Sequence, residues 1–199
     1  MNMFDTVLLC MDLQNDLVRG EGKMAGSGLS DQVAARDLLA TVQKLQDAVR
    51  SAGGSVAHVR VAYRADYRDN PCTSPRGQRL KASGALIEGT WGSAIHDQVA
   101  PLDDEMIFTK HAVNPFFNTG LMTWLNNGQA RHLLLCGVAT NMVVESAARY
   151  ADDAGFQVTV VEDACASFRA DWHEFSTTVI LPLIGRVASS SDLTKEISK

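Results

Sequence analysis

Short apolar runs, separated by amphipathic or irregular stretches, are the strongest pattern in this chain and predict its strands. They occupy residues 6–12, 55–63, 105–111, 132–139 and 156–164. Runs of this length, rich in valine and leucine, are typical of strands. The central runs are apolar on both faces, which is the pattern of strands buried in a parallel sheet.

Helical spacing appears in the segments between these runs. Val33, Leu38, Val42, Leu45 and Val49 recur near a helical period, and this pattern predicts a helix over 31–53. The Gly-Gly pair at 53 and 54 would end that helix. Two further helices are expected, over 119–127 and 141–154.

Strands that alternate with helices predict an α/β fold. We expect three layers, α/β/α, around an open, Rossmann-like parallel sheet of about six strands. The chain has 199 residues, and 46% of them are hydrophobic, which is enough to bury one full core. Residues 1–199 are therefore predicted to form a single domain.

Composition and charge argue against several classes of function. The net charge is −5 and the pI is near 5.5, so the basic face that binds nucleic acid is not expected. No run of about 18 apolar residues is present, and the N-terminal residues lack a secretion signal. We expect a cytoplasmic protein without nucleic-acid or membrane partners. Four cysteines without metal or disulfide spacing, Cys10, Cys72, Cys136 and Cys165, should be reduced.

Three candidate polar features stand at the ends of predicted strands. Asp12 ends the first run, Lys110 ends the third, and the sequence GVATN at 137–141 ends the fourth. Ligands of open parallel sheets bind beyond the carboxyl ends of the strands, so these features should share one rim. The irregular segment 64–101 is too long for an ordinary connection and is a candidate lid over that rim.

These segments resemble the signature of the isochorismatase-like cysteine hydrolases. The match is carried by VLLCMDLQNDL at 7–17, MIFTKHAVNPFFNTGL at 106–121 and the stretch from LLLCGVATNMVVES to DACAS at 133–167. The resemblance implies that Asp12 transfers protons and that Lys110 assists it. It also places Val143 where the family has its nucleophilic cysteine. The turn residues Ala139, Thr140, Asn141 and Met142 would hold an oxyanion through their backbone N–H groups.

A valine cannot attack a carbonyl, and three readings follow. In the first, Asp12 protonates a vinyl ether, as in isochorismatases proper, which also lack the cysteine. In the second, Asp12 and Lys110 activate water against an ester, an imine or an activated amide. In the third, the chain is not an enzyme and either binds a small carboxylate or amide or acts as a structural partner in an oligomer. A cysteine amidohydrolase whose nucleophile was replaced by Val143, by engineering or otherwise, is also compatible with the sequence.

Substrate contacts are expected mainly from the irregular segment. By side-chain chemistry and position, the candidates are Gln14, Tyr63, Arg64, Tyr67, Trp91, His111 and Phe116, and Arg76, Gln78 and Arg79 are further possibilities. Arginines there could pair with a substrate carboxylate. The five histidines show no metal-ligand spacing, so neither a metal nor another cofactor is expected. The resemblance implies a homodimer or homotetramer, with Phe116, Phe117 and Trp124 as interface candidates.

Overall fold

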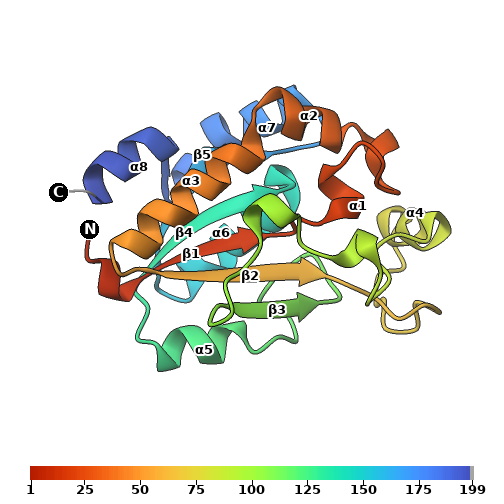
Figure 1. Ribbon diagram of the computed structural model, residues 1–199, viewed down its shortest axis with the longest axis horizontal. Coiled ribbons are helices and arrows are strands. Elements are labelled where there is room, and N and C mark those ends of the chain that lie inside the picture. The colour runs from red at the N-terminus through yellow and green to blue at the C-terminus, as the bar shows by residue number, and fades with distance from the viewer. Residues whose placement is uncertain (198–199) are drawn as a thin grey trace.

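Six parallel strands form one sheet in the order β3-β2-β1-β4-β5-β6 (Figure 1) in the computed structural model, which describes residues 1–197. The order confirms the predicted open parallel α/β sheet. Five strands coincide with the apolar runs, and the sixth, β6, is a three-residue edge strand that no run indicated. The strands are β1 (Thr6–Met11), β2 (Ser55–Val61), β3 (Met106–Lys110), β4 (His132–Val138), β5 (Gln157–Ala166) and β6 (Arg186–Ala188).

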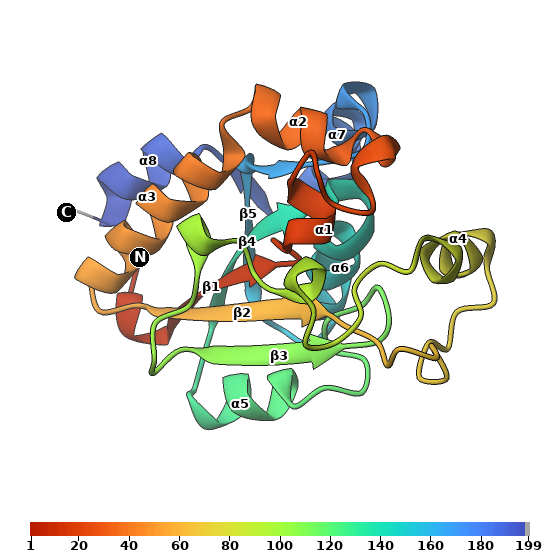
Figure 2. The same cartoon turned by 45° about the vertical axis from the view of Figure 1, so that its right-hand side comes forward.

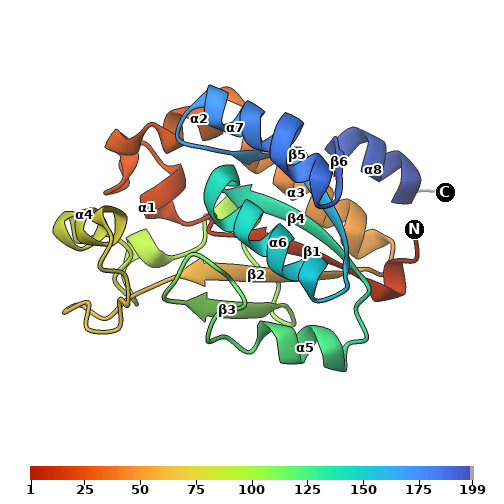
Figure 3. The same cartoon turned by 180° about the vertical axis from the view of Figure 1, so that it is seen from behind.

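Helices cover both faces of this sheet. The helices α3 and α8 lie over the face seen in Figure 1, and α6 lies over the opposite face, seen in Figure 3. The α-helices are α1 (Asn15–Val18), α2 (Leu29–Ala35), α3 (Leu38–Ser51), α4 (Pro75–Ser83), α5 (Leu121–Asn127), α6 (Glu145–Asp153), α7 (Ala170–Phe175) and α8 (Ser190–Ile197). No helix among residues 1–197 has the length and apolar character needed to cross a membrane.

Two predicted helices differ from the structure. The helix expected over 31–53 is divided into α2 and α3, because Asp37 has a left-handed conformation with φ 48°. All of its periodic apolar side chains are nevertheless buried against the sheet. The helix expected over 141–154 begins instead as a π-helical turn, η5 (Thr140–Val144), which continues into α6.

Gly137 allows β4 to approach β1 closely at the end that carries the candidate site. Its φ is +124°, and a Cβ there would lie 2.0 Å from the Met11 carbonyl oxygen. Residues with a side chain rarely adopt this conformation and could not fit the space. The glycine therefore lets the turn after β4 lie beside the end of β1, where Asp12 follows.

The long connection between β2 and β3 is largely ordered by contacts with the segment after β1. It contains α4 and two 3-10 turns, η3 (Trp91–Ser93) and η4 (Asp97–Val99). The Asp16 carboxylate accepts a hydrogen bond from the Leu86 backbone N–H at 2.7 Å. As Figure 2 shows, α4 stands beyond the carboxyl ends of β2 and β3. The segment expected as a lid therefore reaches the predicted rim.

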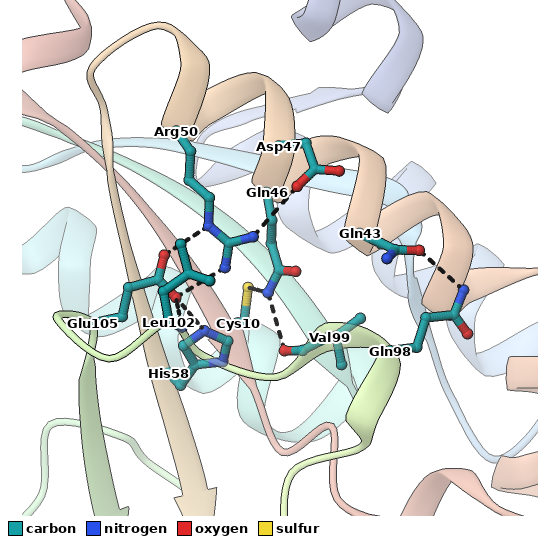
Figure 4. Close-up of polar contacts among 10 residues, drawn as sticks. All are labelled: Cys10, Gln43, Gln46, Asp47, Arg50, His58, Gln98, Val99, Leu102 and Glu105. Atoms are coloured by element: carbon teal, nitrogen blue, oxygen red, sulfur yellow. Dashed lines mark hydrogen bonds and ion pairs between the residues drawn. The ribbon is translucent and has the colours of Figure 1, made fainter.

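A buried polar cluster fixes the far end of the same connection (Figure 4). Glu105 accepts hydrogen bonds from Arg50 Nε at 2.8 Å and Arg50 Nη2 at 2.9 Å. Its Oε2 also lies 3.2 Å from His58 Nε2 and accepts from the Leu102 backbone N–H at 3.0 Å. The cluster joins the approach to β3 with α3 and β2, on a different part of the fold from the rim.

Candidate active site

Asp12 and Lys110 form a buried ion pair at the carboxyl ends of β1 and β3. Lys110 Nζ donates to Asp12 Oδ2 at 2.7 Å and to the Val113 carbonyl oxygen at 2.9 Å. Asp12 follows β1 with φ 60°, and its backbone N–H donates to the Val59 carbonyl oxygen at 2.8 Å. The strand ends thus bring together two side chains that lie 98 residues apart in the sequence.

The second oxygen of Asp12 is buried without a hydrogen-bond partner among residues 1–197. Burial raises the pKa of Asp12 above the ordinary value, although the charge and hydrogen bond of Lys110 and the charge of Arg76 oppose the shift. Desolvation disfavours the ionised form of a carboxyl. The side chain therefore holds a proton more readily than an aspartate in water, as a proton-transfer group requires.

A cavity of about 90 Å³ lies against this pair. It is lined by the three charged side chains Asp12, Lys110 and Arg76 and otherwise by apolar ones. The apolar lining consists of Leu17, Met24, Leu29, Val61, Leu80, Leu86, Ala112, Val113, Val138, Ala139, Met142, Val143 and Phe168. In an apolar cavity, a small number of polar groups is enough to fix the orientation of a small ligand.

The turn after β4 forms one wall of this cavity. Val138, Ala139, Met142 and Val143 line it, and the peptide bond between Val138 and Ala139 is cis. Val143 is 1% exposed and shares the cavity with Asp12 and Lys110. The Met142 N–H donates to the Ala139 carbonyl oxygen at 3.0 Å, so that N–H is engaged within the turn.

The other two residues of the expected oxyanion turn direct their side chains away from the cavity lining. Thr140 Oγ1 lies 2.8 Å from His173 Nδ1. The Asn141 Oδ1 atom accepts a hydrogen bond from Ser167 Oγ at 2.5 Å. Neither of these two residues lines the cavity.

Three side chains that were expected to contact the substrate form hydrogen bonds with backbone groups instead. Gln14 Nε2 donates to the carbonyl oxygens of Val61 and Ser93 at 2.7 and 2.8 Å, and Gln14 Oε1 accepts from the Val61 N–H at 2.8 Å. The Tyr63 hydroxyl donates to the His111 carbonyl oxygen at 3.1 Å, and the Tyr67 hydroxyl donates to that of Ala85 at 2.6 Å. These side chains hold the β2–β3 connection in place and do not line the cavity.

The remaining expected contacts also lie outside the cavity lining. Arg64 pairs with Asp66 at 3.3 Å on the surface, and His111 Nε2 lies 3.4 Å from Asp69 Oδ2. Trp91 is 51% exposed. The ring of Phe116 is buried and stacks on Tyr150, with centroids 4.6 Å apart. Of the interface candidates, Phe117 is exposed, whereas the Trp124 ring packs against Phe108.

A family model agrees with this arrangement. The model of the Isochorismatase domain matches residues 6–192. The chain belongs to the isochorismatase family. One relative, the isochorismatase family protein YecD of Escherichia coli O157:H7, is 30% identical over 196 residues, which cover 97% of this chain and 96% of YecD.

One curated relative and one solved structure extend the comparison. The ureidoacrylate amidohydrolase RutB of Rhizobium rhizogenes is 28% identical over 209 residues, covering 98% of this chain and 84% of RutB. The fold is shared with a cysteine hydrolase from Pseudomonas syringae pv. phaseolicola 1448A, with a TM-score of 0.86 and 24% identity over 100% of this chain and 94% of the other. The match to this family supports hydrolysis as the class of reaction.

Most of the apolar residues in the cavity wall carry no signal in the sequence. Met24 lies between α1 and α2, Leu29 is the first residue of α2, and Phe168 follows β5. No periodic pattern distinguishes these side chains from ordinary core residues. Arg76 was recognisable only as one of several arginines in the irregular segment. In the structure it is half-buried, with Nη2 2.8 Å from Cys72 Sγ.

The buried cysteines do not supply a replacement nucleophile. A hydrogen bond to Cys10, together with burial, raises the pKa of the Cys136 thiol. Burial raises the pKa of Cys165 to about 12. Thiols with raised pKa values have little thiolate character. None of the four cysteines lines the cavity around Asp12.

Proposed function

We propose that this chain hydrolyses a small organic molecule, with Asp12 as the proton-transfer group and water as the nucleophile. The observation that carries the proposal is the unpartnered Oδ1 atom of buried Asp12, beside an apolar cavity with Val143 in its wall. Lys110 occupies the other carboxylate oxygen and holds the carboxyl in place. No step requires a thiol at position 143.

Proton donation is the first of two reactions compatible with this site. Because its pKa is raised, Asp12 is neutral over a wider range of pH than an ordinary aspartate, and the neutral form can donate its proton to the alkene carbon of a vinyl ether. The alkene electron pair then forms the C–H bond and leaves an oxocarbenium ion. Water adds to that ion and returns a proton to Asp12, and the resulting hemiketal separates into an alcohol and a carbonyl compound.

Base catalysis is the second reaction. Ionised Asp12 accepts a proton from water as that water attacks an ester, an imine or an activated amide, and the proton passes to the leaving group. The similarity to the amidohydrolase RutB supports a carbon–nitrogen bond as a target. Without a covalent step the substrate must be more reactive than an ordinary amide.

The charges around the cavity favour an anionic substrate. Asp12 and Lys110 pair with each other, whereas no carboxylate among residues 1–197 forms an ion pair with Arg76. An arginine without a carboxylate partner can bind a substrate carboxylate through two parallel hydrogen bonds. The volume of about 90 Å³ is small beside the roughly 300–1,000 Å³ of drug-sized ligand sites, so the buried part of the substrate should be small.

The direct test is turnover on a panel that contains a vinyl ether, activated esters, imines and ureido or carbamoyl acids. Asp12→Asn should abolish any product formation and retain the fold. Asp31→Asn, at an exposed position on α2, is the matched control and should leave turnover unchanged. Loss of activity as pH rises through the Asp12 pKa would identify proton donation, and loss as pH falls would identify base catalysis. No turnover on the whole panel by the folded protein would overturn the proposal and favour a ligand-binding role.

A further inference from the structure

A chain of polar side chains lies behind the turn that forms the cavity wall. Thr140 Oγ1, in η5, is 2.8 Å from His173 Nδ1, in α7. His173 Nε2 is 3.5 Å from Glu162 Oε2, on β5, and Arg36 Nη2 donates to the same oxygen at 2.9 Å. Thr140 and His173 are 0% and 5% exposed. The chain therefore runs from the surface at Arg36 to the base of the turn.

His173 Nε2 forms no hydrogen bond among residues 1–197, but the Glu162 carboxylate 3.5 Å away is the nearby charge that favours one position of the imidazole proton. A neutral ring with its proton on Nδ1 would direct the lone pair of Nε2 at the Glu162 carboxylate, which is unfavourable. The proton is therefore assigned to Nε2, facing the carboxylate, and Nδ1 accepts the hydrogen bond from the Thr140 hydroxyl. Burial, followed by the charge of Arg36, lowers the pKa of His173 and favours this neutral form, although Glu162 opposes the shift.

Neighbouring contacts come from the same segment, 167–176. Ser167 Oγ donates to Asn141 Oδ1 at 2.5 Å, and Ser176 Oγ donates to Glu145 Oε1 at 2.5 Å. Residues 140, 141 and 145 are thus each held by a side chain from this segment. Phe168, in the same segment, also lines the cavity. Because hydrogen bonds in a buried network restrict side-chain and backbone motion, the segment fixes the turn from its outer side.

We propose that His173 is a positioning residue which, through the Thr140 hydroxyl, holds the turn so that position 143 faces the Asp12–Lys110 pair. His173 does not line the cavity and touches no reacting group. Its effect on turnover rests on the proposed function. Its effect on the orientation of position 143 does not, and a thiol introduced there can report it without any substrate.

The reporter is Val143→Cys. A thiol at position 143, which lines the same cavity as Lys110, should be alkylated by iodoacetamide faster than Cys72, the one native cysteine that is not buried. The unmodified protein provides the background rate. The dependence of the alkylation rate on pH then measures how well the turn and Lys110 favour the thiolate.

Matched pairs of substitutions in the Val143→Cys background test the network. Thr140→Val keeps the shape of threonine but removes the hydroxyl, whereas Thr140→Ser restores a hydroxyl. His173→Leu removes the acceptor, whereas His173→Asn is similar in shape to leucine and places a carbonyl oxygen near the position of Nδ1. Thr140→Val and His173→Leu should lower the alkylation rate at neutral pH roughly fivefold or more, the size expected for one lost hydrogen bond. Serine and asparagine should restore most of the rate.

The outcomes separate positioning from simple support of the fold. Near-ultraviolet circular dichroism and the melting temperature confirm that each variant is folded, and if a His173 variant does not fold, the Thr140 pair decides alone. Equal alkylation rates and equal pH midpoints in folded Thr140→Val and Thr140→Ser would overturn the proposal, even if valine lowers the melting temperature. If the unmodified protein shows no turnover, the proposed function fails, but the alkylation result still decides the role of His173. If turnover is found, Thr140→Val should lower kcat with little change in KM.

Discussion

Lys110 Nζ lies 2.7 Å from Asp12 Oδ2, with only 2% of the lysine and 8% of the aspartate side chain exposed. In a pair this deeply buried, each charge compensates for the lost hydration of the other. Removal of one partner leaves an uncompensated buried charge. Removal of both does not, so the two positions should be strongly coupled in their effects on stability.

A double-mutant cycle measures this coupling. Lys110→Met and Asp12→Asn should each lower the free energy of unfolding, by about 3 kcal/mol for a broken buried pair. The combined variant should lose clearly less than the sum of the two, because no buried charge remains unpaired. Urea denaturation at neutral pH provides all four values. Additive losses would mean that the pair contributes no coupling energy.

The same lysine should control the protonation of Asp12. Burial raises the Asp12 pKa, and the charge and hydrogen bond of Lys110 oppose it more than the charge of Arg76 does. Lys110→Met leaves burial largely unopposed, so Asp12 should stay protonated to higher pH, with a smaller shift in the same direction for Arg76→Met. The carbon-13 shift of the Asp12 carboxyl, assigned by its absence in Asp12→Asn, follows the titration. A lower Asp12 pKa in Lys110→Met than in the unmodified protein would contradict this electrostatic account.

Close contact between β4 and β1 requires a glycine at position 137. Gly137→Ala would place a methyl group 2.0 Å from the Met11 carbonyl oxygen, at a φ of +124°. Both the overlap and the backbone strain should destabilise the fold, by at least about 3 kcal/mol. Gly26→Ala, where no atom lies within 4 Å, is the control and should change stability little. Thermal unfolding that is equal for the two variants would show that the strands can separate locally without cost.

The sequence predicted the centre of the candidate site better than its walls. Asp12 and Lys110 could be placed because parallel strands bring their carboxyl ends to one edge, whatever the intervening chain does. Tyr63 and Tyr67 resembled ligand contacts, but their hydroxyls bind backbone carbonyl oxygens of the connection in which they lie. Whether these hydroxyls bind a ligand or a backbone carbonyl oxygen depends on the folded path of the connection, which no local pattern encodes.

The helix boundaries show a similar limit. Apolar spacing placed the core face of the segment 31–53 correctly, but the break at Asp37 leaves that spacing intact. The π-helical turn at Thr140–Val144 also continues the apolar pattern of a helix. Hydrogen bonds with Ser167 and His173 hold this turn, and both residues follow β5, so no local pattern links them to it.

Glu105, which lies outside the candidate site, should make the free energy of unfolding depend on pH in the acidic range. Burial raises the pKa of this carboxyl, but hydrogen bonds from Arg50 and the Leu102 N–H, with the charge of Arg50, together hold it below the ordinary value of 4.5. A lowered pKa in the folded state stabilises the protein above the pKa of the unfolded chain, and that contribution is lost as pH falls through the folded pKa.

Glu105→Gln should therefore lower the free energy of unfolding at neutral pH by about 2 kcal/mol, as expected for hydrogen bonds to a charged group. The difference from the unmodified protein should shrink as pH falls below 4.5, where Glu105 of the unfolded chain takes up a proton, and should be lost once pH passes the lower pKa of folded Glu105. Asp103→Asn, at an exposed position on the same connection, should show neither effect. Urea denaturation at a series of pH values measures the free energy of unfolding of each variant. If the difference between Glu105→Gln and the unmodified protein stayed constant at all acidic pH values, the charge of Glu105 would contribute nothing to the cluster.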